Sequence, residues 1–304
     1  MNSLDRFKGF FYALITSATF GLIPLFTLPL MAKGLPYDSI LFYRFTTAAL
    51  VLVGIMLVKK ESFRVKKDEI PFLILLGVFY TISALFLFWG YTVMSAGIAT
   101  TLHFTYPVFV TLLMVIFFRE KASIVTNLAI LLAICGVGFL SIDGSDTQIS
   151  LMGILLVLLS AVGYAFYIVT VNKSRIRTMS GRKLTLYAFI VSAFLFLVKA
   201  SLGEGIQPLP DQSSLINLLF LAIVPTVVSN MALIQAVRYI GGTLTSIMGA
   251  MEPVTAVCVG VLLFNEPLTF NLIIGILLII IAVSIIILAK TILHLIHSKK
   301  SASG

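Results

Sequence analysis

Long apolar segments separated by short polar ones make up almost the whole chain. Ten of them are each about as long as an α-helix needs to cross the roughly 30 Å of hydrocarbon in a bilayer. In chain order, as spans 1 to 10, they cover residues 10–30, 39–58, 71–91, 97–118, 126–142, 151–171, 184–202, 215–239, 243–264 and 270–289. The pattern predicts an all-α membrane protein with ten transmembrane helices, whose loops are too short for a soluble catalytic domain.

Two parts of the chain repeat each other at a constant offset of 146 residues. Pro107 and Glu120 recur as Pro253 and Glu266, and in both places the glutamate closes an apolar segment that contains the proline. At these helix boundaries we expect the glutamates to cap a helix or form an interfacial pair. The offset predicts a first five-helix repeat at 10–142, a second at 151–289 and a basic tail at 290–304. Because five is an odd number, the repeats enter the membrane from opposite sides and are inverted.

Basic residues are distributed unevenly between the loops. If the N-terminus is cytoplasmic, 18 of the 21 Lys and Arg residues fall in cytoplasmic segments, whereas Lys33 and Lys199 are external and Arg44 lies within span 2. The positive-inside rule then predicts that both termini are cytoplasmic. We also expect the chain to lie in the cytoplasmic (inner) membrane of a prokaryote. The net charge of +9 is therefore explained by membrane anchoring and not by binding of nucleic acid.

Prolines inside the apolar segments predict breaks in three spans. Pro107 in span 4, Pro225 in span 8 and Pro253 in span 9 each remove a backbone hydrogen bond, at a cost of about 3 kcal/mol in a soluble helix. In spans 4 and 9 the carbonyls that lose a donor are those of His103 and Gly249. Broken helices at the midplane line the substrate site of many secondary transporters. Spans 4 and 9 are the best candidates for a transport path, although such prolines can also bend helices merely for packing.

An acidic residue lies close to the centre of span 9. The repeat offset pairs this residue, Glu252, with Tyr106 of span 4, one turn from His103. An ionisable group at this depth is costly and is by default a functional hypothesis. Glu252 can bind a substrate amine, carry a coupling proton, or pair with Arg44 or His103. His103 can relay a proton or form a neutral hydrogen bond between helices.

Further polar and aromatic residues are candidates for the same substrate-binding site. Arg44 can attract a substrate carboxylate or extend to the external interface. Trp89 can belong to an interfacial aromatic belt or to the site. Tyr164 lies on the polar face of span 6, and Ser229 and Asn230 follow the proline of span 8, where their side chains can satisfy freed backbone groups or a ligand.

Two motifs and one arginine carry a family resemblance. They are Tyr106-Pro107 followed by Arg119-Glu120, Glu252-Pro253 followed by Asn265-Glu266-Pro267, and Arg44 within Tyr43-Arg44-Phe45. With them the chain resembles the drug/metabolite transporter superfamily, specifically its ten-helix exporters built from two EamA-type domains. The resemblance implies an inverted-repeat bundle around a central cavity and export of amino acids, related metabolites or drugs. Span 1 departs from the family pattern, because Phe20-Gly21 stands where a tryptophan-glycine pair is common.

The function that we predict is export of a small amphipathic or zwitterionic metabolite by a secondary transporter with alternating access. A lipid or lipid-linked sugar flippase is the alternative. The chain, 60% hydrophobic and 11% charged, contains no metal-ligand spacing, phosphate loop or nucleophile motif, so we expect no enzyme, metal or cofactor. Proton coupling is a hypothesis. The expected partners are the substrate and membrane lipids, and the protein is expected to be a monomer or a homodimer.

Overall fold

The computed structural model describes residues 3–119, 124–141 and 151–302, and these residues form helices and connecting loops without strands. Within these described residues, eight helical segments are long and apolar enough to cross a membrane, and two shorter apolar helices cover 127–140 and 251–264. The ten apolar segments of the sequence thus correspond to ten helical segments. The chain is a multi-pass membrane protein.

The described part of the first half contains seven helices, and in two places a pair of helices lies within a single apolar segment. Their bounds are α1 (Ser3–Gly21), α2 (Ile23–Ala32), α3 (Tyr37–Val58), α4 (Ile70–Gly90), α5 (Ala96–His103), α6 (Tyr106–Phe118) and α7 (Ile124–Ser141). The pairs α1–α2 and α5–α6 are each interrupted close to the middle of a span. Pro24 and Pro107 lie in the first turn of the second helix of each pair, where a missing N–H costs nothing.

The second half has a similar order of elements. It consists of α8 (Leu151–Lys173), a 3-10 turn η1 (Arg175–Thr178), α9 (Gly181–Ser201), α10 (Gln212–Ala222), a π-helical turn η2 (Ile223–Val228), α11 (Ser229–Met248), α12 (Met251–Phe264) and α13 (Phe270–Ala302). Pro225 lies within η2, so at this proline the backbone hydrogen bonds span five residues in place of four, and the helix does not stop.

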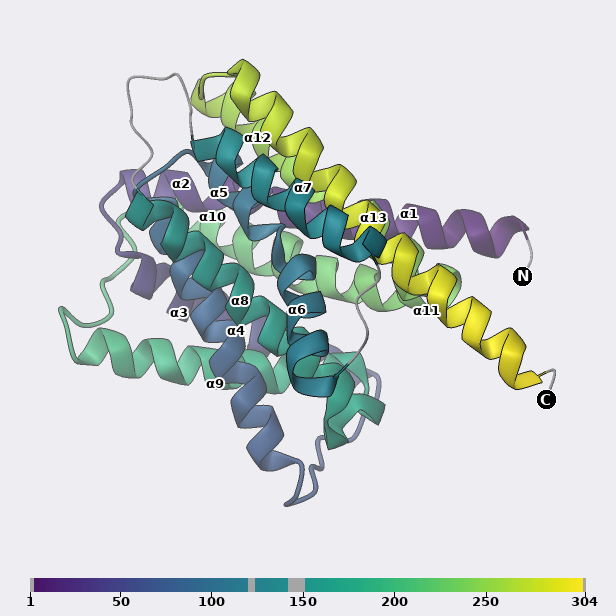
Figure 1. The fold of residues 1–304 in the computed structure, drawn as a ribbon. Helices are drawn as coiled ribbons and strands as arrows, with labels where there is room; N and C mark the ends of the chain where they lie inside the picture. The colour runs from purple at the N-terminus through teal and green to yellow at the C-terminus, as the bar shows by residue number, and fades with distance from the viewer. Residues whose placement is uncertain (1–2, 120–123, 142–150, 303–304) are drawn as a thin grey trace.

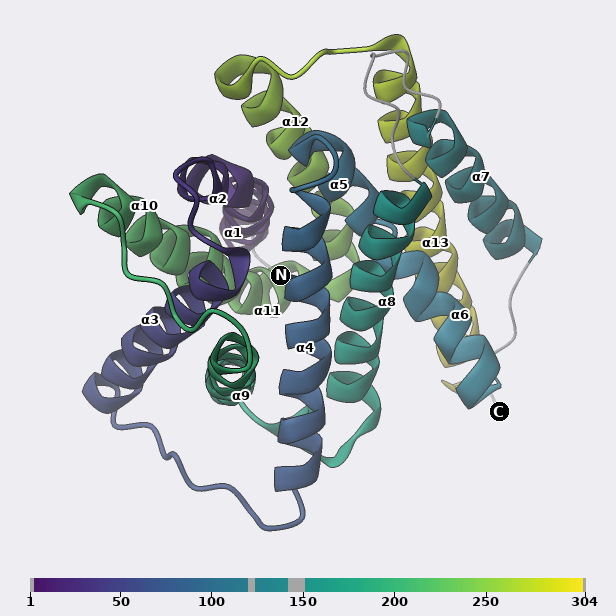
Figure 2. The ribbon, with the colours of Figure 1, turned by 90° about the vertical axis from the view of Figure 1, so that its left-hand side faces the viewer.

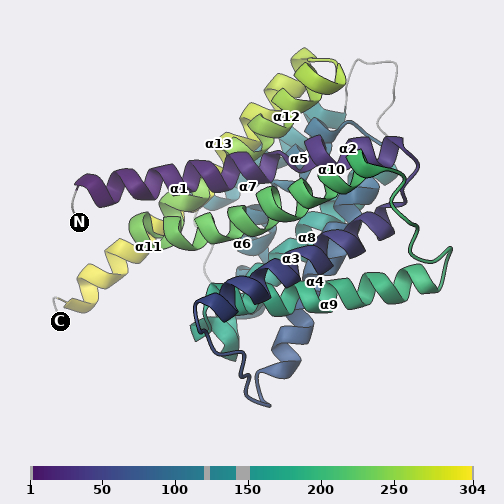
Figure 3. The same ribbon diagram turned by 180° about the vertical axis from the view of Figure 1, so that it is seen from behind.

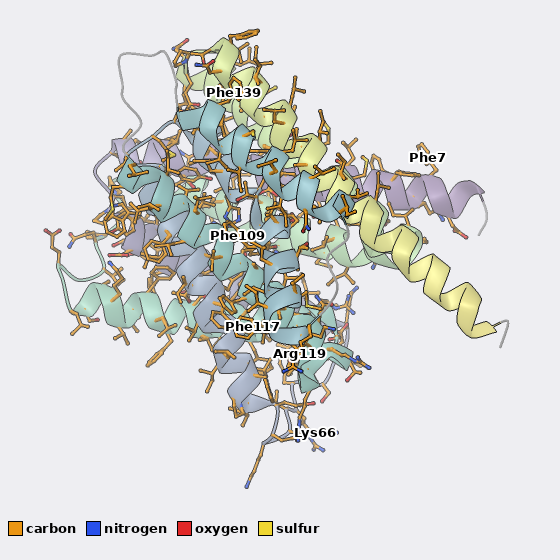
Figure 4. The ribbon with its side chains drawn as sticks, viewed as in Figure 1. Phe7, Lys66, Phe109, Phe117, Arg119 and Phe139 are labelled. Atoms are coloured by element: carbon orange, nitrogen blue, oxygen red, sulfur yellow. The ribbon has the colours of Figure 1, made fainter. Side chains whose placement is uncertain are left out.

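The helices pack around α4, which lies against both α8 and α9 (Figures 1 and 2). Seen from behind, α1 and α11 lie side by side, and the start of α1 and the end of α13 project on the same side of the bundle (Figure 3). The pair α7–α13 lies at the periphery (Figure 2). Apolar side chains such as Phe117 and Phe139 are exposed on the outside of the bundle, as a surface in contact with lipid requires (Figure 4). Cys135 and Cys258 also lie on this exposed surface.

Spans 8 and 9 differ most from the sequence prediction. The sequence predicts a turn between residues 239 and 243, but α11 is helical across this stretch and ends only at Met248. Three contacts trace the chain along α1: Ser229 with Thr16, Ile240 with Gly9, and Thr255 with Gly21. From Ser229 to Ile240 the chain therefore runs antiparallel to α1, and by Thr255 it has returned toward the end of α1 at Gly21. The reversal lies between Ile240 and Thr255, whereas residues 241 and 242, where the sequence predicts a turn, are helical.

The last helix is also longer than span 10. The sequence predicts an end near residue 289 followed by a basic tail, whereas α13 has 33 residues and ends at Ala302. Neither glycine nor proline occurs between residues 276 and 302, so no residue that breaks a helix interrupts this stretch.

The backbone repeats itself at the ends of α6 and α12. Arg119 and Asn265, 146 residues apart, cap these helices in the left-handed conformation, both with a φ of 54°. In each case the cap N–H bonds to the carbonyl five residues earlier, which satisfies a terminal carbonyl. Glu120 lies outside the described residues. The tandem repeat read from the sequence thus has a counterpart in local geometry.

Ion pairs tie the loops together at each end of α3. Lys33 lies before the first turn of α3 and pairs with Asp211. Asp38 lies within that first turn and pairs with Lys199 at 2.5 Å. Beyond its other end, Arg182 pairs with Glu61, and this hydrogen-bonded guanidinium lowers the pKa of the Glu61 carboxyl. These pairs each join segments that the charge distribution assigns to one side of the membrane. Which end is cytoplasmic stays a prediction.

Candidate functional site

A cavity lies among the helices, where both broken spans of the repeat meet α3, α4 and α8. It is lined by Phe20, Ile23, Arg44, Phe45, Tyr80, Ser83, Ala84, Leu87, Phe88, His103, Tyr106, Tyr164 and Glu252. Tyr106 begins α6 and Glu252 lies in the first turn of α12, so the N-terminal ends of these two half-helices lie at the cavity. Such ends carry partial positive charge from the helix dipole.

The structure brings five of the eight substrate-binding candidates together in this cavity, namely Arg44, His103, Tyr106, Tyr164 and Glu252. The other three do not line it. Trp89 is 37% exposed on the outside of the bundle and stacks on Phe86. Ser229 bonds to Thr16 of α1, and the amide of Asn230 donates to the Thr226 carbonyl at 2.6 Å. Ser229 therefore bonds to a neighbouring helix, and Asn230 satisfies a backbone carbonyl one turn earlier in its own span.

Glu252 faces the cavity without a partner. Its carboxylate makes no hydrogen bond and no ion pair with the part of the chain that the structure describes. The pairing with Arg44 or His103 that the sequence allowed is thus not formed in this conformation. The Gly249 carbonyl, expected to be freed by Pro253, accepts from the backbone N–H of Glu252 at 2.9 Å. The break at residues 249–250 is therefore a satisfied turn that places Glu252 at the start of α12.

Arg44 is held on three sides and is only 3% exposed. Its Nε donates to the hydroxyl of Thr226 at 2.9 Å, and its guanidinium carbon lies 5.4 and 5.5 Å from the ring centroids of Phe45 and Phe88. The Thr226 hydroxyl in turn donates at 2.8 Å to the carbonyl of Leu221, five residues earlier in α10. No described carboxylate pairs with Arg44. The arrangement leaves its terminal nitrogens for an anionic ligand.

His103 is fixed by two serines. The Ser160 hydroxyl donates to the Ser83 carbonyl at 2.6 Å, and its oxygen lies 3.0 Å from Nδ1 of His103. A hydroxyl has one hydrogen, so the second contact requires Nδ1–H to donate to Ser160. In the neutral ring Nε2 is then the acceptor nitrogen. The sequence allowed two roles for His103, a proton relay or a neutral hydrogen bond between helices. This contact is of the second kind, because Ser160 belongs to α8 and His103 to α5.

Aromatic rings form one wall of the cavity. Tyr164 stands edge-on to Tyr106 with centroids 4.8 Å apart, and its ring also contacts Tyr80 and His103. The hydroxyls of these three tyrosines make no hydrogen bond to the described residues. Their rings can therefore pack on an apolar ligand group while their hydroxyls bond to a polar one.

Sequence reasoning missed Tyr80 in the wall, and it treated Thr226 only as a residue able to satisfy freed backbone groups or a ligand, not as the partner beneath Arg44. A signal was present, because Tyr80 and Thr226 are 146 residues apart and so occupy matching places in the two repeats. Neither residue is ionisable at neutral pH, and tyrosines and threonines are common in membrane helices. Only the packing of α3 against α4 and η2 distinguishes them.

Comparisons with known proteins agree on the kind of protein. The model of the EamA-like transporter family matches residues 7–142 and 151–288. An uncharacterized transporter of Archaeoglobus fulgidus is 26% identical over 80% of this chain and 86% of its own length. Solute carrier family 35 member G1 of Mus musculus is 29% identical over 46% of this chain and 39% of its own. A crystal structure with 17% identity covers 96% of this chain and 99% of that chain with a TM-score of 0.67, which shows the same fold.

Proposed function

The chain belongs to the EamA-like transporter family, and on that premise we propose that it is a secondary transporter that exports small zwitterionic metabolites, such as amino acids, by alternating access. The single observation that supports this substrate class is the cavity. It contains a guanidinium and a carboxylate, Arg44 and Glu252, that form no ion pair with each other or with another described side chain. Buried charges are normally paired, so an unpaired set of both signs suits a ligand that carries both signs.

The aromatic wall extends the proposal to amphipathic substrates. Tyr80, Tyr106 and Tyr164 offer ring faces and free hydroxyls on one side of the cavity, and Phe45 and Phe88 flank Arg44. A zwitterion with an apolar side chain can place its carboxylate at Arg44, its ammonium at Glu252 and its side chain against the rings. Drug-like amphiphiles with an amine can use the same groups.

Alternating access follows from the inverted repeats that we infer from the odd number of spans and the charge distribution. The two broken spans are related by the repeat offset, and their half-helices meet at the cavity. Rocking one repeat against the other around this point exposes the site to each side in turn. We further propose that the protein lies in the cytoplasmic membrane with both termini inside, and that Glu252 binds a proton when the substrate amine is absent, which couples export to the proton gradient.

Counterflow in proteoliposomes tests the proposed substrate class. Vesicles with purified protein are loaded with one unlabelled compound, and uptake of the same labelled compound is followed. We expect exchange of an amino acid at least tenfold faster than exchange of the amine or the carboxylic acid that keeps the same side chain, since each analogue leaves one buried charge unpaired. Vesicles without protein are the control. Scrambling of a labelled phospholipid without exchange of any metabolite would identify a flippase and overturn the proposal.

Thr226 provides a narrower prediction about how the carboxylate is bound. Thr226→Val removes the acceptor of the Arg44 Nε–H at constant size, so the guanidinium loses its orientation. We expect the KM for carboxylate-bearing substrates to rise about tenfold, equivalent to a net hydrogen bond of about 1.4 kcal/mol. Thr226→Ser keeps the hydroxyl and should restore the KM. Initial rates of counterflow measure both variants, and an unchanged KM in Thr226→Val would show that this hydroxyl does not position Arg44.

A further inference from the structure

An apolar groove lies outside the cavity, between the loop after α3, the start of α4 and α9. It is lined by Val65, Ile70, Leu73, Ile74, Tyr187 and Val191 and shares no residue with the cavity. Ile70 and Ile74 are 45% and 50% exposed, so the groove opens to the outside of the bundle. Since α4 and α9 are membrane spans, an occupant of this groove comes from the bilayer.

The wall formed by α9 changes in polarity along the helix. Lys183, Tyr187 and Val191 are four residues apart and therefore lie on one face. The Tyr187 hydroxyl donates to the Phe63 carbonyl at 2.6 Å, and the Lys183 ammonium donates to the Arg64 carbonyl at 3.0 Å. These bonds place a cation at the loop end of the groove, an aromatic ring next to it and an aliphatic side chain deeper in the membrane.

The loop end of the groove carries uncompensated positive charge. The nearby carboxylates are already engaged: Glu61 with Arg182, Asp68 with Arg175, and Glu69 with the backbone N–H of Lys66. The side chains of Arg64, Lys66, Lys67 and Lys183 pair with no carboxylate of the described residues. In Figure 4, Lys66 lies at the tip of the loop between α3 and α4, which is the end of the bundle expected to face the cytoplasm.

We propose that this groove binds an anionic phospholipid of the leaflet at that end, with one acyl chain between Ile74 and Val191 and the headgroup phosphate at Lys183 and the Arg64–Lys66 segment. The apolar part of the groove lies in hydrocarbon and suits an acyl chain. The unpaired cations at its end select an anionic headgroup over a zwitterionic one, because each Lys or Arg near the headgroup adds attraction to negative charge. The lipid joins the loop to α9, and its binding is independent of transport through the cavity.

Thermal unfolding of the purified full chain in a neutral detergent tests the proposal. Phosphatidylglycerol and phosphatidylcholine with the same acyl chains are added separately, and the change in Tm on lipid addition is measured for each variant. We expect phosphatidylglycerol to raise Tm by about 5 °C and phosphatidylcholine to raise it much less. Lys183→Gln should remove most of the difference between the two lipids. Ile74→Trp fills the groove at an exposed position and should remove the effect of both.

Lys8→Gln is the matched control, because Lys8 is an exposed cation near the start of α1. Its neighbour in sequence, Phe7, lies far from Lys66 in Figure 4. It should keep the full response to phosphatidylglycerol. Equal shifts with both lipids, or a Lys183→Gln response equal to that of the parent protein, would overturn the proposal. Inorganic phosphate alone should cause no shift, and a shift as large as that of the lipid would mean a free-anion site. Because the Tm of each variant with lipid is compared with the Tm of the same variant without lipid, a change in its basal stability does not affect the comparison.

Discussion

Glu252→Gln should reduce proton-driven transport at least tenfold and abolish its dependence on the pH gradient. Glutamine has the same size, so the turn at residues 249–250 and the start of α12 are preserved, but the side chain can neither carry a proton nor balance an ammonium group. A charge-assisted hydrogen bond contributes about 1.5 to 3 kcal/mol, which corresponds to a loss of roughly ten- to a hundredfold. Flux in proteoliposomes with and without an imposed pH gradient measures the effect.

Two further variants separate the roles of this carboxyl group. Glu252→Asp keeps the charge on a shorter side chain and should retain the pH dependence with a lower rate. If Glu252 only carries the proton, counterflow without a gradient survives in Glu252→Gln; if it also binds the substrate amine, counterflow falls as well. Flux and pH dependence equal to those of the parent protein would rule out both roles for Glu252.

Glu266→Ala should lower the free energy of unfolding by about 2 kcal/mol. The carboxylate of Glu266 accepts the backbone N–H of Ala96 at 2.7 Å and of Gly97 at 3.2 Å, and so caps the first turn of α5 from the opposite repeat. Buried N–H groups left without an acceptor cost about 1 to 3 kcal/mol each, partly recovered by local relaxation. In detergent, we expect Tm to fall by roughly 4 to 8 °C.

Glu204→Ala is the control for this second prediction, because Glu204 lies exposed in the loop after α9 and its side chain has no hydrogen bond to the described residues. It should leave Tm unchanged. Gly260→Ala offers an independent check: a Cβ at this position would lie 2.1 Å from Oε2 of Glu266 and would displace the cap. A Tm for Glu266→Ala within one degree of the parent value would mean that α5 does not need this cap.

Several features of the site were predictable because they depend on order along the chain. The repeat offset paired Tyr106 with Glu252, and the prolines beside them marked the turns that bring both residues to the cavity. The end of span 8 was not predicted correctly from the sequence, since α11 continues where the sequence predicts a turn. Trp89 shows a second limit: an aromatic residue near the end of a span suits an interface and a binding site equally well, and its place outside the cavity depends on the rotation of α4.

By itself, the sequence determined the class of the protein, its apolar spans, the tandem repeat and the residues at which two spans break. These properties follow from hydrophobic length, chain offset and the missing N–H of proline, which need no neighbouring helix. The tertiary structure decided which helix faces meet. In a bilayer the lipid-facing and buried sides of a helix are both apolar, so hydrophobicity does not specify helix rotation. For this reason only the folded chain shows that Thr226 lies beneath Arg44, that Glu266 caps the first turn of α5, and that Glu252 faces the cavity without a partner.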